Sequence, residues 1–272
     1  MIYEKFTIPR LEIHVSHFCN LKCDNCNHFS NYNIKGFLTL EQFIDWNKPW
    51  VKKIFPKTFQ LLGGEPTANP DLISICNESR NIWVKSRILL ITNGFFLKNH
   101  PDLPETLEKN NIQLVVSIHD DSEEYTKRIC NIKETISSWQ EKYKFNCSYR
   151  ESFQMWYKTF KKDENDNTIP FHDNNPQLSY KNCLSKEAKQ LFNGNIYKCP
   201  PLTYLNLIKQ KYSLSSEWDF YLNYKPLTPN STIKEIKDFF SKESEQFCNM
   251  CASNPIKYKK QNPLLQLGIK KF

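Results

Sequence analysis

The feature that constrains this chain most is a group of three closely spaced cysteines. Cys19, Cys23 and Cys26 have the spacing C-x3-C-x2-C and follow a short segment, residues 11–16, in which apolar and polar side chains alternate. An alternation of period two predicts a strand with one buried face, so we expect the cysteines on a loop directly after a strand. Thiolates are the usual protein ligands of iron-sulfur clusters, and three of them can hold three irons of a [4Fe-4S] cube while the fourth iron stays open.

A structural zinc site is the alternative for these thiols. Tetrahedral zinc needs four ligands, commonly in recurrent CxxC or CxxH pairs. His17 or His28 would have to supply the fourth ligand. The ligand spacing favours a cluster over zinc.

The cysteine run, with Asn20 and Leu21 after the first cysteine, resembles the radical S-adenosylmethionine (SAM) family. The resemblance implies that the amino and carboxylate groups of SAM chelate the open iron. An electron from the cluster then cleaves the sulfonium and gives a 5'-deoxyadenosyl radical, with a flavodoxin or ferredoxin as the usual reductant. The residue before the third cysteine is usually aromatic in the family and is Asn25 here. Since that position mainly offers its backbone to the adenine, Asn25 is still expected at the cofactor.

A second motif follows a predicted buried strand at residues 59–62. Gly63 and Gly64 lack Cβ atoms, which lets the backbone approach a ligand closely, and a carboxylate follows at Glu65. In the family, a GGE motif at the end of the second strand hydrogen-bonds the amino group of SAM. These three residues match that motif, and Pro66 matches its common continuation. The resemblance therefore implies that this turn binds the cofactor.

Three further polar residues end predicted strands: Asn93 in residues 87–94, Ser117 in 112–117 and Arg150 in 144–150. Asn93 belongs to a Thr-Asn-Gly strand ending that is frequent in the family. Ser117 resembles the strand-four hydroxyl that contacts the ribose or carboxylate of SAM. Arg150 is suited to pair with the cofactor carboxylate as a bidentate cation, and a surface salt bridge is an equal alternative.

The predicted elements indicate the fold class. Helices are expected at about residues 40–54 and 122–139, and Asn69-Pro70-Asp71 is expected to cap a helix between them with the proline at its first position. Strands that alternate with helices predict an α/β protein with a parallel sheet. The resemblance implies a partial (β/α)6 TIM-like barrel over residues 1–182. The motifs fall at the C-terminal ends of strands, where parallel barrels place their active sites.

A second set of cysteines lies in the C-terminal part of the chain. Cys183 and Cys199 flank an Asn-Gly-Asn sequence that predicts a β-hairpin turn, and Cys248 and Cys251 form a C-x2-C pair. This arrangement resembles the auxiliary-cluster module called SPASM or, in its shorter form, the twitch domain. The resemblance implies a second [4Fe-4S] cluster held by all four thiols. An all-thiolate zinc site is the alternative.

The resemblance also divides the chain into domains. Residues 183–255 are expected to form a small auxiliary-cluster domain of a β-hairpin and helices, and residues 256–272 a tail. A helix with an apolar side is predicted from Ser231 onward, before the last cysteine pair.

Several residues are candidates for the substrate pocket without a motif to support them. They are Tyr149, Trp156, Tyr157 and His28, with His17 and His119 also near predicted strand ends. A histidine that is simply satisfied in the core is the commoner outcome. The remaining thiols, at Cys76, Cys130 and Cys147, are expected to be buried small hydrophobic side chains.

Composition limits the cellular setting. No apolar run approaches eighteen residues, so no membrane span is predicted, and residues 1–5 lack the apolar core of a signal peptide. The cytoplasm is therefore expected, and ten cysteines in such a chain favour metal ligation over disulfides. The net charge of +8 is compatible with a nucleic-acid partner, but two clusters would bring it nearer to about +5.

The leading functional hypothesis is radical-based oxidation of a small polar substrate, such as a sugar, cyclitol or nucleotide derivative, with the auxiliary cluster as electron acceptor. The single auxiliary cluster makes the chain similar to twitch-type dehydrogenases that oxidise an aminocyclitol. The enzymatic alternatives are modification of a peptide or protein and modification of a nucleic-acid base. The alternative without catalysis is a zinc-binding interaction module.

Overall fold

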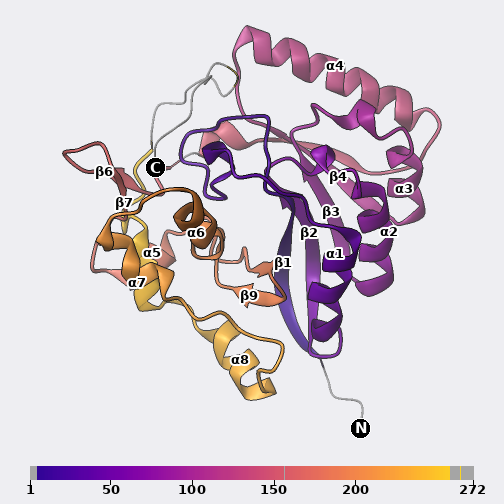
Figure 1. The fold of residues 1–272 in the computed structure, drawn as a ribbon. Coiled ribbons are helices and arrows are strands. Elements are labelled where there is room, and N and C mark those ends of the chain that lie inside the picture. Colours follow the sequence, from indigo (N-terminus) through magenta and orange to yellow (C-terminus); the bar gives the residue numbers. More distant parts are fainter. Residues whose placement is uncertain (1–4, 156, 258–263, 265–272) are drawn as a thin grey trace.

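The computed structural model describes residues 5–155, 157–257 and 264, and contains one seven-stranded sheet (Figure 1). The strand order is β5-β4-β3-β2-β1-β8-β9, and every neighbouring pair is parallel except β8 with β9. The strands are β1 Phe6–Ser16, β2 Ile54–Gly63, β3 Arg87–Thr92, β4 Ile112–Ile118, β5 Cys147–Glu151, β8 Gln190–Phe192 and β9 Asn195–Tyr197. A separate two-stranded sheet joins β6 Lys161–Lys162 to β7 Thr168–Ile169.

Eight α-helices accompany the strands in the described part of the chain. They are α1 Leu40–Asn47, α2 Leu72–Ile82, α3 Leu103–Lys109, α4 Glu123–Gln140, α5 Pro176–Lys181, α6 Pro200–Lys211, α7 Asp219–Leu222 and α8 Ile233–Ser241. Short 3-10 turns span Ser30–Tyr32, Lys48–Trp50, Pro66–Ala68, Leu97–Asn99, Ser152–Met155, Ser216–Trp218 and Gln246–Met250. In Figure 1, α1 to α4 lie on one side of the sheet and α5 to α8 on the other. The α/β class with a mostly parallel sheet is confirmed, as expected for a partial TIM-like barrel.

The first strand is buried on both faces, whereas its sequence predicts one buried face. Leu11, Ile13 and Val15 are fully buried in the main core, as expected. The alternate positions Glu12 and His14 are also buried, with 3% and 2% exposure. The C-terminal part of the chain covers this polar face, so burial there depends on tertiary contacts rather than on the strand's own alternation.

Two helix boundaries differ from the sequence-based expectation. The helix expected at residues 40–54 ends at Asn47 and gives way to a 3-10 turn around Pro49, because proline lacks an N–H and disfavours helix at the preceding residue. The next helix begins at Leu72 after Asp71, so Pro70 lies outside it. The Asn69 side chain instead accepts the Asp71 N–H at 2.8 Å.

The boundaries of other elements agree more closely with the sequence-based prediction. Helix α4 differs by one residue at each end from the predicted range, and its inner face buries Tyr125 and three isoleucines. Strand β5 begins at Cys147 rather than near residue 144. The predicted hairpin between β8 and β9 is confirmed, with Asn193 and Gly194 at φ values of 49° and 73°.

Strand β8 also bears on the predicted domain division. It pairs with β1 through Glu12–Gln190 and Ile13–Leu191, so the main sheet continues past residue 183. The boundaries 1–182, 183–255 and 256–272 remain predictions. Most of the last segment, residues 258–263 and 265–272, lies outside the described residues.

The three remaining cysteines do not share one environment. Cys76 is buried, as expected, but Cys130 is exposed and Cys147 is half-buried. Cys130 follows the core residue Ile129 on α4, and one residue along a helix turns a side chain by about 100° away from the core. Within the described residues, no helix is both long and apolar enough to cross a membrane.

Candidate functional site

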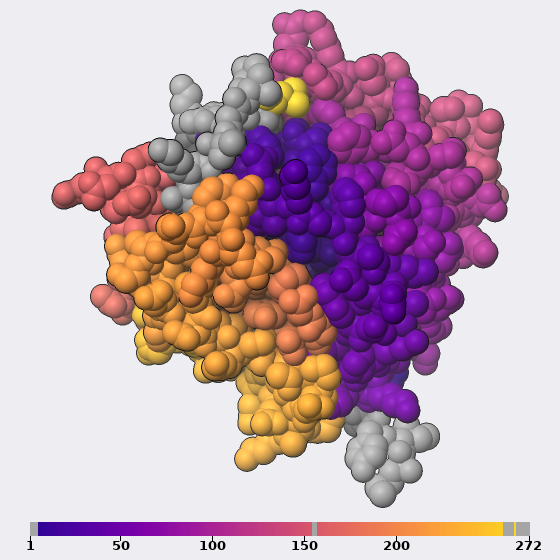
Figure 2. All heavy atoms as spheres, viewed as in Figure 1, coloured from indigo at the N-terminus to yellow at the C-terminus, as the bar shows by residue number. Residues whose placement is uncertain are grey.

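A cavity of about 440 Å³ lies at the C-terminal ends of the parallel strands and is closed by the C-terminal part of the chain. Its wall contains Cys19, Cys23 and Cys26 together with three members of the second set, Cys183, Cys199 and Cys251. Figure 2 shows the C-terminal segment, in orange, packed along the N-terminal segment, in indigo. This volume is within the usual range for small-ligand sites.

The first cysteine loop directs main-chain N–H groups at its sulfurs. The Leu21 N–H donates to Cys19 Sγ at 3.4 Å. Burial raises the pKa of the Cys26 thiol, and hydrogen bonds from the backbone N–H groups of residues 28–31 lower it. Such donors stabilise thiolates over thiols, which is what a bound cluster requires. Asn25 lies on the cavity wall at a φ of 51°, and its carboxamide accepts the Thr159 N–H at 3.2 Å.

The glycine pair allows strands β1 and β2 to approach each other where the cysteine loop begins. A Cβ on Gly63 would lie 2.2 Å from the Ser16 carbonyl oxygen, and one on Gly64 would lie 2.2 Å from the Phe18 carbonyl oxygen. Gly63 also has a φ of 151°. Both glycines line the cavity. No other residue type fits here, so the glycines fix the backbone immediately before Cys19.

Glu65 is fully buried and is absent from the cavity wall, as is the buried Pro66. Its carboxylate accepts the Thr67 N–H at 2.9 Å, the Asn93 N–H at 2.7 Å and the Thr92 hydroxyl. Burial raises the pKa of Glu65, and these hydrogen bonds lower it. The structure thus shows Glu65 positioning the end of β3. Its implied contact with the SAM amino group stays a prediction, as does the role of Pro66.

Asn93 connects this carboxylate to the cysteine loop. Its side chain donates to Asn20 Oδ1 at 2.9 Å, and the same nitrogen lies 3.9 Å from Cys19 Sγ. Asn93 lines the cavity, as the sequence predicts for a cofactor residue.

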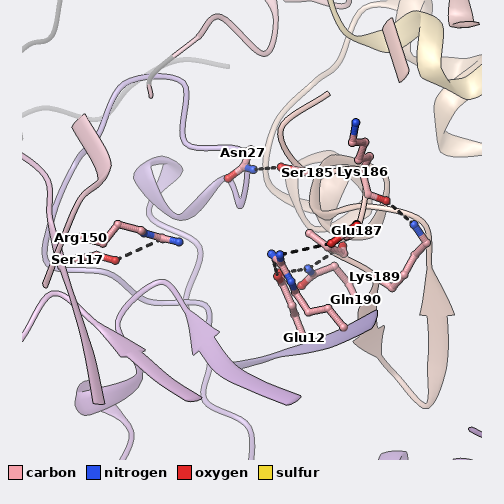
Figure 3. A network of polar contacts seen from close by, with 11 residues as sticks. Glu12, Asn27, Ser117, Arg150, Ser185, Lys186, Glu187, Lys189 and Gln190 are labelled. Atoms are coloured by element: carbon pink, nitrogen blue, oxygen red, sulfur yellow. Dashed lines mark hydrogen bonds and ion pairs between the residues drawn. The ribbon is translucent and has the colours of Figure 1, made fainter. Parts of the chain in front are cut away.

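Ser117 and Arg150 also line the cavity, from neighbouring strands (Figure 3). The Arg150 guanidinium donates to Ser117 Oγ at 3.5 Å and to Ser152 Oγ at 3.2 Å. Burial lowers the pKa of Arg150, and the Glu12 carboxyl raises it. Among the described residues, Arg150 forms no ion pair, so the alternative of a surface salt bridge is not supported. Arg150 is an exposed residue whose guanidinium lies on the cavity wall, where it is a suitable partner for a carboxylate ligand.

The candidate pocket residues separate into two groups. His28 and Tyr157 line the cavity, as does His119. Tyr149 does not; it is 41% exposed, and its ring faces the Lys133 ammonium at 5.2 Å, away from the site. Trp156 lies outside the described residues.

Three histidines form a cluster on the polar face of β1. His14 Nε2 lies 2.6 Å from His28 Nδ1, and His14 Nδ1 lies 3.1 Å from His17 Nδ1. The Tyr204 ring stacks on the His14 ring with a centroid distance of 3.8 Å. Burial lowers the pKa of His17 and of His28 to about 4, so these rings are neutral at pH 7.

Sequence reasoning missed a polar network on the opposite wall (Figure 3). Gln190 donates to Glu12 at 2.6 Å, and Arg10 forms an ion pair with Glu12 at 3.3 Å. Asn27, in the cysteine loop, donates to Ser185 Oγ at 3.0 Å. The alternation in β1 predicted Glu12 on a solvated face. The Gln190–Glu12 and Asn27–Ser185 contacts each span more than 150 residues of chain, so no local signal could reveal them.

The second thiol set comes from three separate parts of the chain. Cys183 follows α5, Cys199 is the N-cap of α6, and Cys248 lies in the turn that ends before Cys251. Burial raises the pKa of all four thiols, and that of Cys199 to about 12. The three other thiols raise the pKa of Cys251 further, which shows that the set is close enough to interact.

The donor chemistry fits clusters better than single ions. Among the described residues, no group of three or more His, Cys, Asp or Glu side chains is arranged to hold a metal ion. A zinc ion would need its sulfurs at about 2.3 Å from one point, whereas a cube holds its thiolates further apart. The choice between a cluster and zinc at the second set stays a prediction. Two all-thiol sets on one cavity suit iron-sulfur ligation.

A comparison with protein families matches residues 13–145 to the Radical SAM superfamily. The chain contains a radical SAM domain. Such a domain implies radical chemistry with a [4Fe-4S] cluster and SAM as cofactors.

Two curated relatives match part of the chain. GTP 3',8-cyclase from Aquifex aeolicus (strain VF5) is 30% identical over 137 residues, covering 48% of this chain and 42% of that protein. A probable GTP 3',8-cyclase from Sulfurisphaera tokodaii is 29% identical over 91 residues, covering 34% and 28%. The chain thus spans less than half the length of these relatives.

Solved structures with a similar fold include BtrN in complex with AdoMet and 2-DOIA, with 16% identity, a TM-score of 0.49, and coverage of 88% of this chain and 85% of that one. They also include anSMEcpe with bound AdoMet and Cp18Cys peptide, with 19% identity, a TM-score of 0.40, and coverage of 54% and 42%. SuiB from Streptococcus suis, bound to S-adenosylmethionine, has 13% identity, a TM-score of 0.37, and coverage of 85% and 65%.

Proposed function

We propose that the protein oxidises a small polar substrate, a sugar, cyclitol or nucleotide derivative, by radical SAM chemistry with the help of a second cluster. One observation carries the proposal: both thiol sets line the same cavity. A substrate bound there lies between a site that removes a hydrogen atom and a site that accepts an electron.

The first site would be held by Cys19, Cys23 and Cys26. Bound there, the cluster and SAM supply the radical that removes a hydrogen atom from the substrate. The chain's own contribution is to orient the cofactor and to keep water away from the reacting bond. In this proposal Arg150 binds the SAM carboxylate, and Gly63 and Gly64 fix the backbone immediately before Cys19.

The second site would be held by the four C-terminal thiols in a twitch or SPASM-like module. Saturated by thiolates, a cluster there supplies a one-electron acceptor. Removal of a hydrogen atom, then of one electron and one proton, converts an alcohol to a carbonyl. The described residues place Cys183, Cys199 and Cys251 on the cavity wall, with Cys248 beside them.

The cavity wall favours a substrate rich in hydroxyl groups. Asn27 and Ser185 present an amide and a hydroxyl, and the buried Ser30 hydroxyl has no hydrogen-bond partner among the described residues. Groups that both donate and accept are suited to hydroxyls, and a buried polar atom without a partner is costly unless a ligand satisfies it. The two curated relatives are named for a reaction of GTP, so nucleotides belong in the same test.

We further place the enzyme in the reducing cytoplasm, with a flavodoxin or ferredoxin as the electron donor. Clusters of this kind need a reducing compartment, and many such clusters have low potentials. The domain division at residues 182 and 183 belongs to this proposal.

The proposal is tested with anaerobically reconstituted protein, dithionite, SAM and a panel of polyols, aminocyclitols and nucleotides. We expect 5'-deoxyadenosine and a product lighter by two hydrogens, detected by mass spectrometry. The matched variant Cys248→Ala/Cys251→Ala should fall from about eight irons per chain to about four, still cleave SAM, and give no oxidised product. Equal oxidation by this variant would remove the role of the second cluster. Turnover of peptides or nucleic acid alone would refute the substrate class.

A further inference from the structure

Two lysines near the second thiol set are almost completely buried. Lys189 is 7% exposed and Lys198 is 5% exposed. Lysine is almost never fully buried unless an opposite charge accompanies it, because an unpaired ammonium in a low-dielectric interior costs several kcal/mol. The charges near these two side chains therefore indicate which negatively charged group their surroundings bind.

The described carboxylates do not balance the two ammonium groups. Lys198 Nζ lies 3.6 Å from Glu245 and donates to the Lys242 carbonyl at 3.0 Å. The same Glu245 carboxylate also pairs with the exposed Lys242, at 3.4 Å. Lys189 Nζ donates to the Lys186 carbonyl at 2.6 Å (Figure 3) and has no ion pair among the described residues. Two buried cations thus share one carboxylate, which a third lysine also uses.

The thiols of the second set supply the missing negative charge. Lys189 interacts electrostatically with Cys183, Cys199 and Cys248, and Lys198 with Cys248. As free thiols these groups are neutral and leave Lys189 unpaired. As four thiolates around a cube of core charge about 2+ they form a centre of charge about −2. That charge matches the two buried ammonium groups.

We infer that Lys189 and Lys198 raise the reduction potential of the C-terminal cluster and so make it an electron acceptor. This inference rests on the proposed function. One-electron reduction takes the centre from a charge of about −2 to about −3. A nearby cation stabilises the more negative state by more, so it favours reduction. The lysines are positioning residues in this account, because they act on the substrate only through the cluster.

The inference is tested by redox titration in the Cys19→Ala/Cys23→Ala/Cys26→Ala background, where only the C-terminal cluster gives a spectroscopic signal. Lys189→Met and Lys198→Met should each shift the ratio of reduced to oxidised cluster roughly tenfold toward oxidised at a fixed applied potential, which is a fall of about 59 mV for one electron. Lys189→Arg and Lys198→Arg keep the charge and should stay near the parent value. The matched control is Lys209→Met, since Lys209 is an exposed lysine of α6 and its effect is screened by water.

Four outcomes are distinguishable. A fall in potential in the methionine variants, with recovery in the arginine variants, supports the inference. An intact cluster whose potential is unchanged in both methionine variants overturns it and leaves the proposed function standing. Absence of iron from the C-terminal thiols of the parent overturns both. If Lys189→Met does not fold, as judged by circular dichroism, the Lys198 variants decide, because Lys198 keeps its own contacts.

Discussion

The two thiol sets use the same ligand chemistry in opposite ways. Three thiols of the first set lie on one loop after β1, whereas the four of the second set come from three segments. The first set leaves one position open for a cofactor, and the second can be saturated. In the proposed function, ligand number and chain connectivity distinguish a site for bond cleavage from a site that accepts electrons.

The charges around the two sets differ as well. Neutral histidines surround the first loop, and the buried Glu65 carboxyl, after burial itself, raises the pKa of Cys19. The nearest cation in that loop is the half-buried Lys22, whose pKa burial lowers. Two buried ammonium groups flank the second set. One half-buried lysine faces the first set and two almost fully buried lysines face the second, and nearby cations favour reduction, which fits a strong donor facing an acceptor across one cavity.

The largest expected effect comes from removing the first set. Cys19→Ala/Cys23→Ala/Cys26→Ala should abolish 5'-deoxyadenosine formation and lower the iron content from about eight to about four per chain, because no thiolates remain to hold the open cluster. Iron analysis and chromatography of the SAM products measure this. Persistent SAM cleavage in this variant would show that the C-terminal thiols can replace the first set. It would contradict the functional distinction between the two sites.

The next effect concerns the backbone that holds the first loop. Gly63→Ala places a Cβ 2.2 Å from the Ser16 carbonyl oxygen in a left-handed region, so we expect a loss of at least about 2 kcal/mol in the free energy of unfolding. The control is Gly194→Ala, where φ is 73° but nothing lies within 4 Å. It should cost only about 1 kcal/mol. Equal costs in urea denaturation would show that the close approach of β1 and β2 is unimportant.

A smaller effect is expected on SAM binding. Arg150→Gln removes the cavity guanidinium and should weaken SAM binding roughly tenfold, the value of one charged hydrogen bond. Anaerobic calorimetry on reconstituted protein measures the Kd. Arg128→Gln removes an exposed partner of Glu124 and should leave the Kd unchanged. If both variants bind like the wild type, Arg150 does not contact the cofactor.

The smallest effect is a pH dependence at the first site. Burial and, to a smaller extent, the Arg150 charge lower the pKa of His119 from 6.5 to about 4. The unfolded chain then binds a proton that the folded chain does not, so His119 contributes full stability above pH 6.5 and loses it as pH falls toward 4. Relative to His119→Gln, the wild type should lose up to about 1.4 kcal/mol per pH unit in this window. Parallel unfolding free energies from pH 7 to 5 would contradict this.

Local sequence patterns predicted most of the first site. The spacing of Cys19, Cys23 and Cys26, the Gly63-Gly64 turn and the strand ends at Asn93 and Ser117 all follow from residues close in sequence. They also share one edge of a parallel sheet, so a correct strand assignment brings them together. Tyr149 shows the limit, because a strand end alone did not decide which face its side chain takes.

The sequence by itself determined the α/β alternation, the ligand loop and the hairpin, since these depend on periodicity, spacing and turn chemistry over a few residues. Only the tertiary structure decided that Glu12 and His14 are buried, that the second set shares a cavity with the first, and that Lys189 and Lys198 lie buried beside it. Burial and electrostatic partners depend on which distant segments cover a side chain. That information lies in the packing of the whole chain rather than in any window of its sequence.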